Sequence, residues 1–360
     1  MNLSLQPVIL VAFGEKENLG VGYLMSVLNG AGIPNRMIDF RYDNEEILAS
    51  IRRDDPIVVG FSVIFEACIN EFVKLVKYLR KKGINCHFTA GGYYASLHPE
   101  ELFGLIPELD SIVRFEGEYT FLELVDCLRK NSDWKKVNSL AYGEKGRVIR
   151  TPQRKLEEDL DSFPFPVRRT LREYALGQRY ATLIAGRGCI YNCTFCNTRE
   201  FYRQAGGPLK RIRSPERVVS EMHQLYSEKG CKVFLFQDDD SPVRTAGGNM
   251  WMRSFCSELV RRGLLNKVIW KINCRPDEID PDTFSMMKQH GLFLVFIGLD
   301  DGTDEGLTRL NKKMTVASSL RGVGILRKLE IEFDYGMIMF QPESTFTSLR
   351  ENLRFLQTVC

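Results

Sequence analysis

Residues 186–196 read Gly186-Arg187-Gly188-Cys189-Ile190-Tyr191-Asn192-Cys193-Thr194-Phe195-Cys196, which places three cysteines on one glycine-flanked loop. Three residues separate the first two cysteines and two separate the last two, so a single loop can direct three thiolates inward. Iron–sulfur clusters are normally bound by cysteine thiolates, four of them for a fully ligated cube. Three thiolates leave one iron open, as a catalytic zinc keeps an open position that a structural zinc lacks. The triplet therefore predicts a cluster with one iron available to another ligand.

Two other interpretations of the triplet are a zinc site and a set of structural cysteines. Structural zinc usually has four ligands in paired C-x₂-C spacings, and no second pair follows the triplet. Structural cysteines would scatter along buried faces instead of crowding one loop. The cluster interpretation is therefore favoured over both.

The second half of the chain contains five predicted strands, each separated from the next by a helical stretch. These strands are short apolar runs: Tyr180–Ala185, Val233–Phe236, Val268–Ile272, Leu294–Gly298 and Phe333–Phe340. Such βα units in series predict a partial (β/α) barrel of the TIM type over residues 179–360, with its active site at the carboxyl ends of the strands. The cysteine loop follows the first of these strands. The fifth strand, as the last one, would expose an edge of unpaired backbone groups. We therefore expect that the barrel is incomplete at the C-terminus. Either the chain is one part of a longer protein, or a partner covers this edge.

The first half shows a second α/β pattern over residues 1–130. Five predicted strands alternate with helix-period segments: Val8–Phe13, Met37–Phe40, Ile57–Val63, Cys86–Ala90 and Ile112–Phe115. This alternation predicts an open, doubly wound parallel sheet of the Rossmann-like kind, which receives ligands beyond the carboxyl ends of its strands. Residues 131–178 are predicted to be a linker, with a hairpin (139–142 and 148–151) and an acidic, proline-rich joint at 157–166.

The triplet with an aromatic residue before its last cysteine, C-x₃-C-x-Φ-C, resembles the signature of the radical S-adenosylmethionine (SAM) superfamily. The resemblance implies a 4Fe-4S cluster bound by Cys189, Cys193 and Cys196, whose open iron binds the amino and carboxylate groups of SAM. An electron from the cluster then cleaves SAM to methionine and a 5′-deoxyadenosyl radical. The cofactor carries this chemistry, and the protein supplies binding and orientation.

Other segments at the strand ends resemble the SAM-binding segments of the same superfamily. The implied contacts are Phe195 in the triplet, Asp238 and Asp239 after the second strand, Arg275 after the third, Asp300 after the fourth and Gln341 after the fifth. Asp300 stands where the superfamily usually has Glu, and the fifth segment lacks its second glycine. A solvated acidic cap for the aspartates and a surface position for Arg275 are the alternative interpretations.

The first half resembles the cobalamin-binding domain that precedes the barrel in many radical SAM enzymes. The implied cobalamin contacts are Ser62 after the third strand, Gly91 and Gly92 after the fourth, and Glu116, Gly117 and Glu118 after the fifth. Glycines at these strand ends would let the backbone approach a large ring closely. The alternative is a set of ordinary turn glycines in a domain that binds no ligand.

One loop departs from the cobalamin domains that ligate cobalt through histidine. Those domains carry D-x-H-x-x-G after the first strand, and the matching stretch here is Glu15-Lys16-Glu17-Asn18-Leu19-Gly20. Glu17 stands in the place of the histidine, so we expect cobalt with no imidazole ligand from this loop and only a loop role for Glu17.

Composition excludes several classes of function. The 360 residues are 44% hydrophobic and 26% charged, with a net charge of +3, which gives no footprint of a nucleic-acid partner. The short basic run Lys210, Arg211 and Arg213 is expected to be a solvated loop. No apolar stretch approaches the roughly 20 residues that span a bilayer. Ten cysteines without an export signal predict reduced thiols and a cytoplasmic protein.

These resemblances lead to one favoured function and two alternatives. The favoured function is methyl transfer from SAM through cobalamin to an unactivated carbon or phosphorus of a natural-product, peptide or lipid-type substrate. An external electron donor of the flavodoxin or ferredoxin type would then be a partner. The first alternative is a radical rearrangement or cyclisation on the same cofactors. The second is tRNA methylthiolation, which needs a second cluster and three more converging cysteines, for which Cys68, Cys86 and Cys127 are available.

Overall fold

The computed structural model describes residues 6–14, 17–64, 66–168, 177–243 and 249–360, which fold into two compact units. The first unit comprises Met1–Glu157, Ser162–Thr170 and Glu200–Pro208, and the second comprises Glu158–Asp161, Leu171–Arg199 and Leu209–Cys360. Each unit is built around a sheet of its own.

The first unit contains a seven-stranded sheet with the strand order β2-β1-β3-β4-β5-β6-β7. Strands β1 to β5 are parallel, and β6 and β7 are antiparallel. The strands are β1 (Val8–Ala12), β2 (Asn35–Asp39), β3 (Val58–Ser62), β4 (His87–Gly91), β5 (Ser111–Val113), β6 (Leu140–Glu144) and β7 (Arg147–Arg150). The helices are α1 (Leu19–Gly30), α2 (Asn44–Asp54), α3 (Ile69–Lys81), α4 (Tyr93–Leu97), α5 (Pro99–Leu105) and α6 (Glu118–Arg129).

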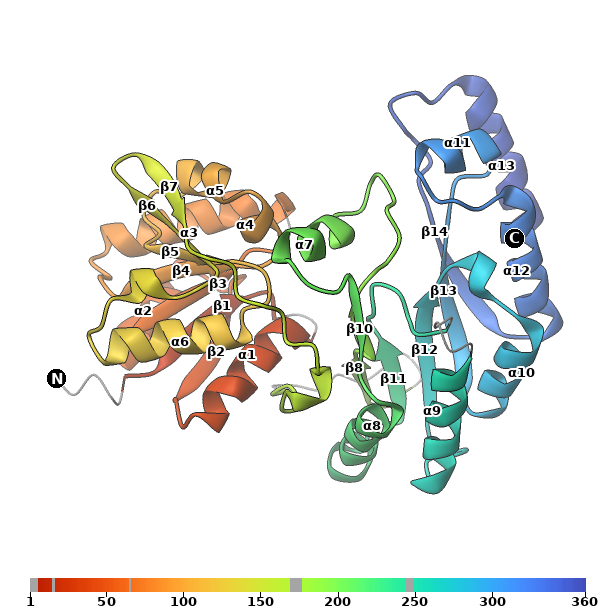
Figure 1. The fold of residues 1–360 in the computed structure, drawn as a ribbon, viewed down its shortest axis with the longest axis horizontal. Coiled ribbons are helices and arrows are strands. Elements are labelled where there is room, and N and C mark those ends of the chain that lie inside the picture. Colours follow the sequence, from red (N-terminus) through yellow and green to blue (C-terminus); the bar gives the residue numbers. More distant parts are fainter. Residues whose placement is uncertain (1–5, 15–16, 65, 169–176, 244–248) are drawn as a thin grey trace. The chain divides into compact units, whose positions relative to one another are not determined.

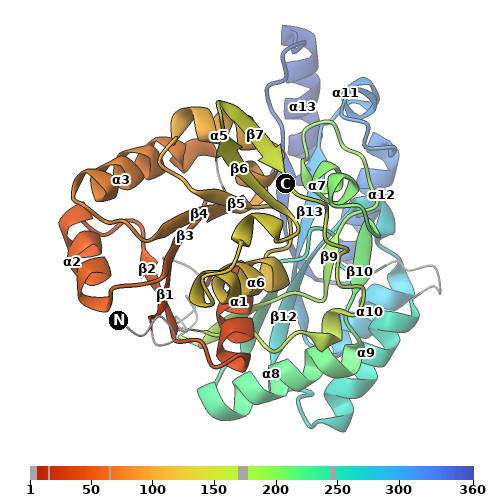
Figure 2. The same ribbon diagram turned by 60° about the vertical axis from the view of Figure 1, so that its left-hand side comes forward.

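Helices cover both faces of this sheet, as Figures 1 and 2 show. Alternate residues of β1 point to opposite faces because side chains alternate along a strand. Val8, Leu10 and Ala12 pack in a core with α1 and α6, whereas Ile9 and Val11 pack in a core with α2 and α3. Strand β1 has β2 on one side and β3 on the other, so the strand order reverses at β1. The predicted doubly wound parallel sheet is confirmed.

The hairpin differs from its predicted place in a linker. Backbone pairing of Val113 with Leu140 adds β6, and then β7, to the edge of the parallel sheet. Because this pairing extends the same sheet, the first unit continues to Glu157 instead of ending near residue 130. The predicted linker also contains residues 169–176, which lie outside the described part of the chain.

The second unit contains a five-stranded parallel sheet in the sequential order β14-β13-β12-β11-β8. The strands are β8 (Tyr180–Leu183), β11 (Val233–Phe236), β12 (Ile269–Cys274), β13 (Leu292–Asp300) and β14 (Glu332–Met337). The helices are α8 (Pro215–Lys229), α9 (Met250–Arg261), α10 (Pro281–Gln289), α11 (Asp304–Arg309), α12 (Val316–Lys328) and α13 (Phe346–Val359). This is the predicted series of βα units. The described part of the two units also contains short 3-10 turns at η2 (Glu66–Cys68), η3 (Trp134–Lys136), η4 (Leu160–Ser162) and η5 (Pro276–Glu278).

One face of the second sheet packs against its helices, while the other is more polar. Trp270, Ile272 and Cys274 of β12 are buried in the core shared with α8, α9 and α10. The alternate residues Lys271 and Asn273 point to the opposite face and are only half-buried. Burial of the apolar face accounts for most of the stability of such a unit, because apolar burial contributes roughly 25 cal/mol per Å².

Two very short strands frame the cysteine loop and have no counterpart in the prediction. β9 (Gly186–Gly188) pairs antiparallel with β10 (Lys210–Ile212). A side chain at Gly186 would place its Cβ 2.7 Å from the carbonyl oxygen of Arg211, so glycine is required for the two backbones to approach.

The basic run, which lies in β10 and directly after it, is largely buried, and the prediction of a solvated loop is wrong. Arg211 and Arg213 are 5% and 4% exposed. The Arg213 guanidinium forms an ion pair with Glu221 at 2.8 Å, and the Lys210 ammonium forms one with Asp240 at 2.5 Å. Paired charges of this kind are tolerated in an interior, and local sequence gives no sign of partners that lie on other elements.

Candidate functional site

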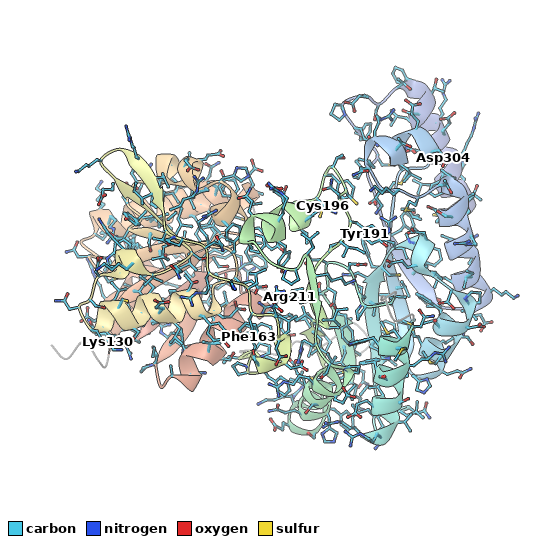
Figure 3. All side chains as sticks on the ribbon, in the orientation of Figure 1. Lys130, Phe163, Tyr191, Cys196, Arg211 and Asp304 are labelled. Carbon is cyan, nitrogen blue, oxygen red and sulfur yellow. The ribbon has the colours of Figure 1, made fainter. Side chains whose placement is uncertain are left out.

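The three cysteines lie on the connection between β9 and α7 (Thr198–Ala205), beyond the carboxyl end of β8. Figure 3 shows Tyr191 and Cys196 on this connection. Cys189 and Cys193 are half-buried, Cys196 is exposed, and none forms a disulfide. In the described part of the chain, no three His, Cys, Asp or Glu side chains lie close enough together to bind one metal ion.

Burial of the loop disfavours the thiolate form of its cysteines while no cluster is bound. Burial raises the pKa of Cys189 to about 12, and the nearby Asp240 carboxylate raises that pKa further. Burial also raises the pKa of Cys193, although the charges of Lys312 and Arg275 oppose the shift. Thiolate is the form that binds metal, so cluster binding must displace a proton from each thiol.

Tyr191, in the middle of the loop, is anchored to residues that follow β12. Its hydroxyl donates a hydrogen bond to Glu278 Oε1 at 2.7 Å, and the Arg275 guanidinium lies 3.9 Å from the centre of its ring. Glu278 is 7% exposed, and burial raises its pKa to about 7. One sequence signal pointed to Tyr191, its place between two cysteines, and none pointed to Glu278.

Three further hydrogen bonds fix the backbone of the loop. The Thr194 N–H donates to the carbonyl of Leu310 at 3.1 Å, and the Asn311 side chain donates to the carbonyl of Asn192 at 2.6 Å. The Arg199 guanidinium donates to the carbonyl of Ile190 at 2.7 Å. These contacts position the loop, mainly through the connection between α11 and α12, and sequence reasoning missed them.

The aspartates after β11 bind the backbone on both sides of the cysteine loop. Asp238 is fully buried and accepts hydrogen bonds from the N–H groups of Ala185, at 3.0 Å, and Gly186, at 2.6 Å. Asp239 accepts from the Gly188 N–H at 3.1 Å and from the Thr198 hydroxyl at 3.3 Å. These contacts give both residues a role in positioning the loop. Their assignment as SAM contacts stays a prediction.

The buried Asp238 carboxyl makes the stability of the protein depend on pH. Burial raises its pKa from 3.8 to about 7, although the two backbone hydrogen bonds oppose the shift. The unfolded state therefore releases this proton first, and the free energy of unfolding falls as the pH rises from about 4 to about 7. Asp238→Asn should flatten this dependence by on the order of 2–4 kcal/mol, measured by urea unfolding across the same range.

A suitable control for that measurement is Asp282→Asn, which removes an exposed carboxylate from the first turn of α10. The control should keep the pH profile of the wild type. An unchanged profile in Asp238→Asn would contradict the assignment of the buried charge.

The remaining predicted SAM contacts lie at the carboxyl ends of β12, β13 and β14. Arg275 is 6% exposed and donates to Asp277 at 2.9 Å and to the carbonyl of Lys312 at 2.6 Å. Its Nη1 atom is buried and has no hydrogen-bond partner among the described residues. An anionic group such as the SAM carboxylate would satisfy that nitrogen, so the structure fits SAM at this position.

Lys312 brings Asp300 and Phe195 together. Its ammonium forms an ion pair with the buried Asp300 carboxylate and lies 6.0 Å from the centre of the Phe195 ring, which is 49% exposed. Gln341 does not join this group, because its side chain donates to Asp301 at 2.6 Å. Lys312 was missed by sequence reasoning because it lies outside every strand end.

In the first unit, the predicted cobalamin contacts lie at the carboxyl ends of three neighbouring strands. Ser62 at the end of β3 lies opposite Gly91 at the end of β4, which in turn lies opposite Val113 at the end of β5. Ser62, Gly91, Gly92, Glu116 and Gly117 are half-buried, and Glu118 is buried in the first turn of α6. We call this set the cofactor edge. Its partly exposed backbone leaves surface on which a large ligand can bind.

Gly92 is required by the backbone, which is a different reason from the expected close approach of a ring. Its φ of +114° is strained for any other residue, and a Cβ would lie 2.7 Å from the carbonyl oxygen of Val63. Ser96, which sequence reasoning missed, connects two loops of the edge: its hydroxyl donates to the Gly92 carbonyl and accepts from the Phe115 N–H, both at 2.7 Å.

Glu17 is part of a buried ion pair, so the expectation that it has only a loop role is wrong. Its carboxylate lies 2.7 Å from the Arg168 guanidinium, and both side chains are 7% exposed. The preceding Glu15 and Lys16 lie outside the described residues. An acidic side chain engaged with arginine occupies the position at which other cobalamin domains carry the histidine ligand.

The three additional cysteines do not converge. Cys68 and Cys86 pack against the core on the α2 and α3 face of the first sheet, whereas Cys127 packs against the core on the α1 and α6 face. A sheet therefore separates them, and one cluster cannot bind all three.

Within the described residues, no helix is long and apolar enough to cross a membrane.

Comparison with known protein families assigns each half of the chain. The family model of the B12 binding domain matches residues 5–125, and that of the radical SAM superfamily matches residues 183–356. The first match includes the cofactor edge and the second includes the cysteine loop. The two domain families account for cobalamin, SAM and a 4Fe-4S cluster as cofactors.

Relatives with both halves are known. The chain is 26% identical over 343 residues to an uncharacterized methyltransferase of Pyrococcus horikoshii, covering 94% of this chain and 72% of that protein. It is 26% identical over 347 residues to an anaerobic magnesium-protoporphyrin IX monomethyl ester cyclase of Cereibacter sphaeroides, covering 93% of this chain and 55% of the cyclase.

A solved structure shares the fold of both halves. The radical SAM methyltransferase TsrM of Kitasatospora setae, with cobalamin and a [4Fe-4S] cluster bound, matches 98% of this chain and 70% of its own with a TM-score of 0.80 and 18% identity. At this identity the likeness establishes the fold alone.

Proposed function

The chain is a member of the radical SAM superfamily with an N-terminal B12-binding domain, and we propose that it transfers a methyl group from SAM to an unactivated carbon or phosphorus. The proposed substrate is a natural product, a peptide or a lipid-type molecule. The observation that carries the proposal is the cysteine loop, which presents three free thiols at the carboxyl end of β8 and is positioned by Tyr191 and Asn311. The methyltransferase from Pyrococcus horikoshii supports methyl transfer as the reaction.

Each proposed site uses residues at the carboxyl ends of the strands or in the loops that follow them. Cys189, Cys193 and Cys196 would bind the cluster. Phe195, Arg275, Asp300 and Gln341 would bind SAM, with Asp238 and Asp239 positioning the loop beside it. The cofactor edge would bind cobalamin. When bound, the cluster supplies the electron that cleaves SAM, and cobalamin carries the methyl group.

In the proposed SAM site, a cationic and an anionic side chain of this chain would bind different groups of SAM. The unpartnered Nη1 of Arg275 would bind the carboxylate of SAM through a charge-assisted hydrogen bond. The ion pair between Lys312 and Asp300 fixes the carboxylate that would accept from the ribose hydroxyls. The exposed Phe195 ring supplies apolar surface next to both groups.

Cyclisation on the same cofactors is the second candidate, because a relative that covers 93% of this chain is named as a cyclase. tRNA methylthiolation is disfavoured, because Cys68, Cys86 and Cys127 lie on different faces of the first sheet. We also propose a one-electron donor of the flavodoxin or ferredoxin type as partner and a cytoplasmic location.

The test uses the anaerobically reconstituted protein with a chemical reductant and SAM labelled with deuterium in its methyl group. The chain spans 55% of the length of the cyclase and 72% of the length of the methyltransferase. Candidate substrates should be screened both in cell extracts and as pure compounds. Methyl transfer predicts a product three mass units heavier with labelled than with unlabelled SAM, together with 5′-deoxyadenosine. 5′-deoxyadenosine and a product without the label would favour cyclisation instead.

A further inference from the structure

Helix α7 directly follows the cysteine loop but belongs for most of its length to the first unit. Its first residues are tied to the second unit, since the Thr198 hydroxyl donates to Asp239 at 3.3 Å. From Glu200 to Pro208 the chain is instead part of the compact first unit. A segment near the start of the radical SAM match is therefore built into the unit that contains the B12-binding match.

Phe201 is the residue through which α7 enters the first unit. Its ring is 4% exposed and stacks on Tyr93 at 4.3 Å between ring centres, with an interplanar angle of 26°. It also meets Phe115 edge-on at 5.2 Å and 74°. Such offset-stacked and edge-to-face pairs are the favoured arrangements of aromatic rings. Phe201 thus forms an aromatic cluster with Tyr93 and Phe115.

Both partners of Phe201 adjoin the cofactor edge. Tyr93 directly follows Gly91 and Gly92, and Phe115 directly precedes Glu116. Phe115 has a φ of +64°, which is uncommon for an aromatic residue, and its N–H is bound by the Ser96 hydroxyl. A backbone conformation of this kind persists only when its surroundings fix it, and the edge-on contact with Phe201 is one of those surroundings.

We propose that Phe201 is a positioning residue for cobalamin: it fixes the loops after β4 and β5 in the shape that receives the cofactor. The cobalamin site is then incomplete without a segment that begins four residues after Cys196. This inference rests on the cobalamin site of the proposed function.

A second consequence follows from the continuity of α7. Any free energy that cobalamin binding contributes to fixing the two loops also favours the docked position of Phe201, and through α7 the end of the cysteine loop. Coupling of this kind is reciprocal, so cluster assembly and cobalamin binding should each favour the other.

The experiment compares the full-length wild type with Phe201→Leu, which keeps most of the buried volume but removes the ring. Hydroxocobalamin is titrated by absorbance into each protein, and iron per chain is measured after reconstitution. Phe201→Leu should bind hydroxocobalamin about tenfold more weakly while keeping its iron, because two ring contacts are lost. Tyr93→Leu should show a similar loss, and the double variant should fall short of the sum of the two because the rings contact each other.

Phe88→Leu is the matched control. Phe88 is fully buried near the opposite end of β4, where Phe61 and Arg80 contact its ring. The Phe88→Leu variant should retain the cobalamin affinity of the wild type. Equal losses in Phe88→Leu and Phe201→Leu, or no loss in either, would overturn the positioning role.

Hydrogen exchange on the cofactor-free proteins gives a readout that does not need cobalamin. In Phe201→Leu the amides of residues 91–93 and 115–118 should exchange faster than in the wild type, with other amides unchanged. Unchanged exchange at these amides would also overturn the proposal. If the wild type bound no cobalamin at all, the proposed function would fail, and this inference with it.

Discussion

A chain in which Cys189, Cys193 and Cys196 are all replaced by Ala should bind no iron–sulfur cluster and should cleave no SAM. The three thiols are the free cysteines of the loop at the carboxyl end of β8, and none of them is engaged in a disulfide. The variant should still fold, because Cys196 is exposed and the backbone contacts of Thr194 and Asn192 are unaffected. Iron content, brown absorbance and anaerobic formation of 5′-deoxyadenosine measure the loss.

The control variants replace Cys68, Cys86 or Cys127, which pack against the two cores of the first unit. Each should keep its iron and lose at most ~0.5–3 kcal/mol of stability, since a buried free cysteine behaves as a small hydrophobe. Reductive SAM cleavage by the triple variant would show that the cluster lies elsewhere.

Glu17→Ala should lower the free energy of unfolding of the first unit by roughly 1.5–3 kcal/mol, because it removes the buried carboxylate that accepts a hydrogen bond from the Arg168 guanidinium. The site is tightly packed: the Val167 N–H donates to the Gly22 carbonyl at 3.0 Å, and a side chain at Gly22 would meet the Val167 carbonyl oxygen at 2.7 Å. Urea unfolding followed by fluorescence measures the change.

The double variant Glu17→Gln with Arg168→Met separates lost charge pairing from lost packing. Removing both charges together should restore most of the stability, since a buried pair replaced by neutral groups of similar volume is often close to neutral in energy. A Glu17→Ala variant as stable as the wild type would show that the pair contributes nothing, and would return Glu17 to the role of a simple loop residue.

The elements of both sheets could be predicted because their signals are local. Val8–Ala12 is an apolar run, its alternate residues face two cores, and its neighbours repeat the pattern. The cysteine loop was equally visible, since its three ligands lie within eight residues. Local signals also located the cofactor edge, because strand ends follow from the strands themselves.

The contacts that position these sites join residues far apart in the chain. Tyr191 and Glu278 are 87 positions apart, and Glu17 and Arg168 are 151 apart. The spacing of hydrophobic residues along the sequence does not reveal contacts between such distant residues. The strands β9 and β10 have three residues each, too few to show a pattern, and the burial of Arg211 follows from their pairing. The place of Phe201 in the first unit was hidden for the same reason, because it depends on Tyr93 and Phe115.

The central claim is that one chain binds one four-iron cluster and one cobalamin that lacks an imidazole ligand from the loop after β1. The most direct measurement is the iron and cobalamin content of the anaerobically reconstituted protein, together with its Co(II) electron paramagnetic resonance spectrum. We expect about four iron atoms and about one cobalamin per chain, with no nitrogen splitting from a protein ligand. About eight iron atoms without cobalamin, or a nitrogen splitting from the protein, would contradict it.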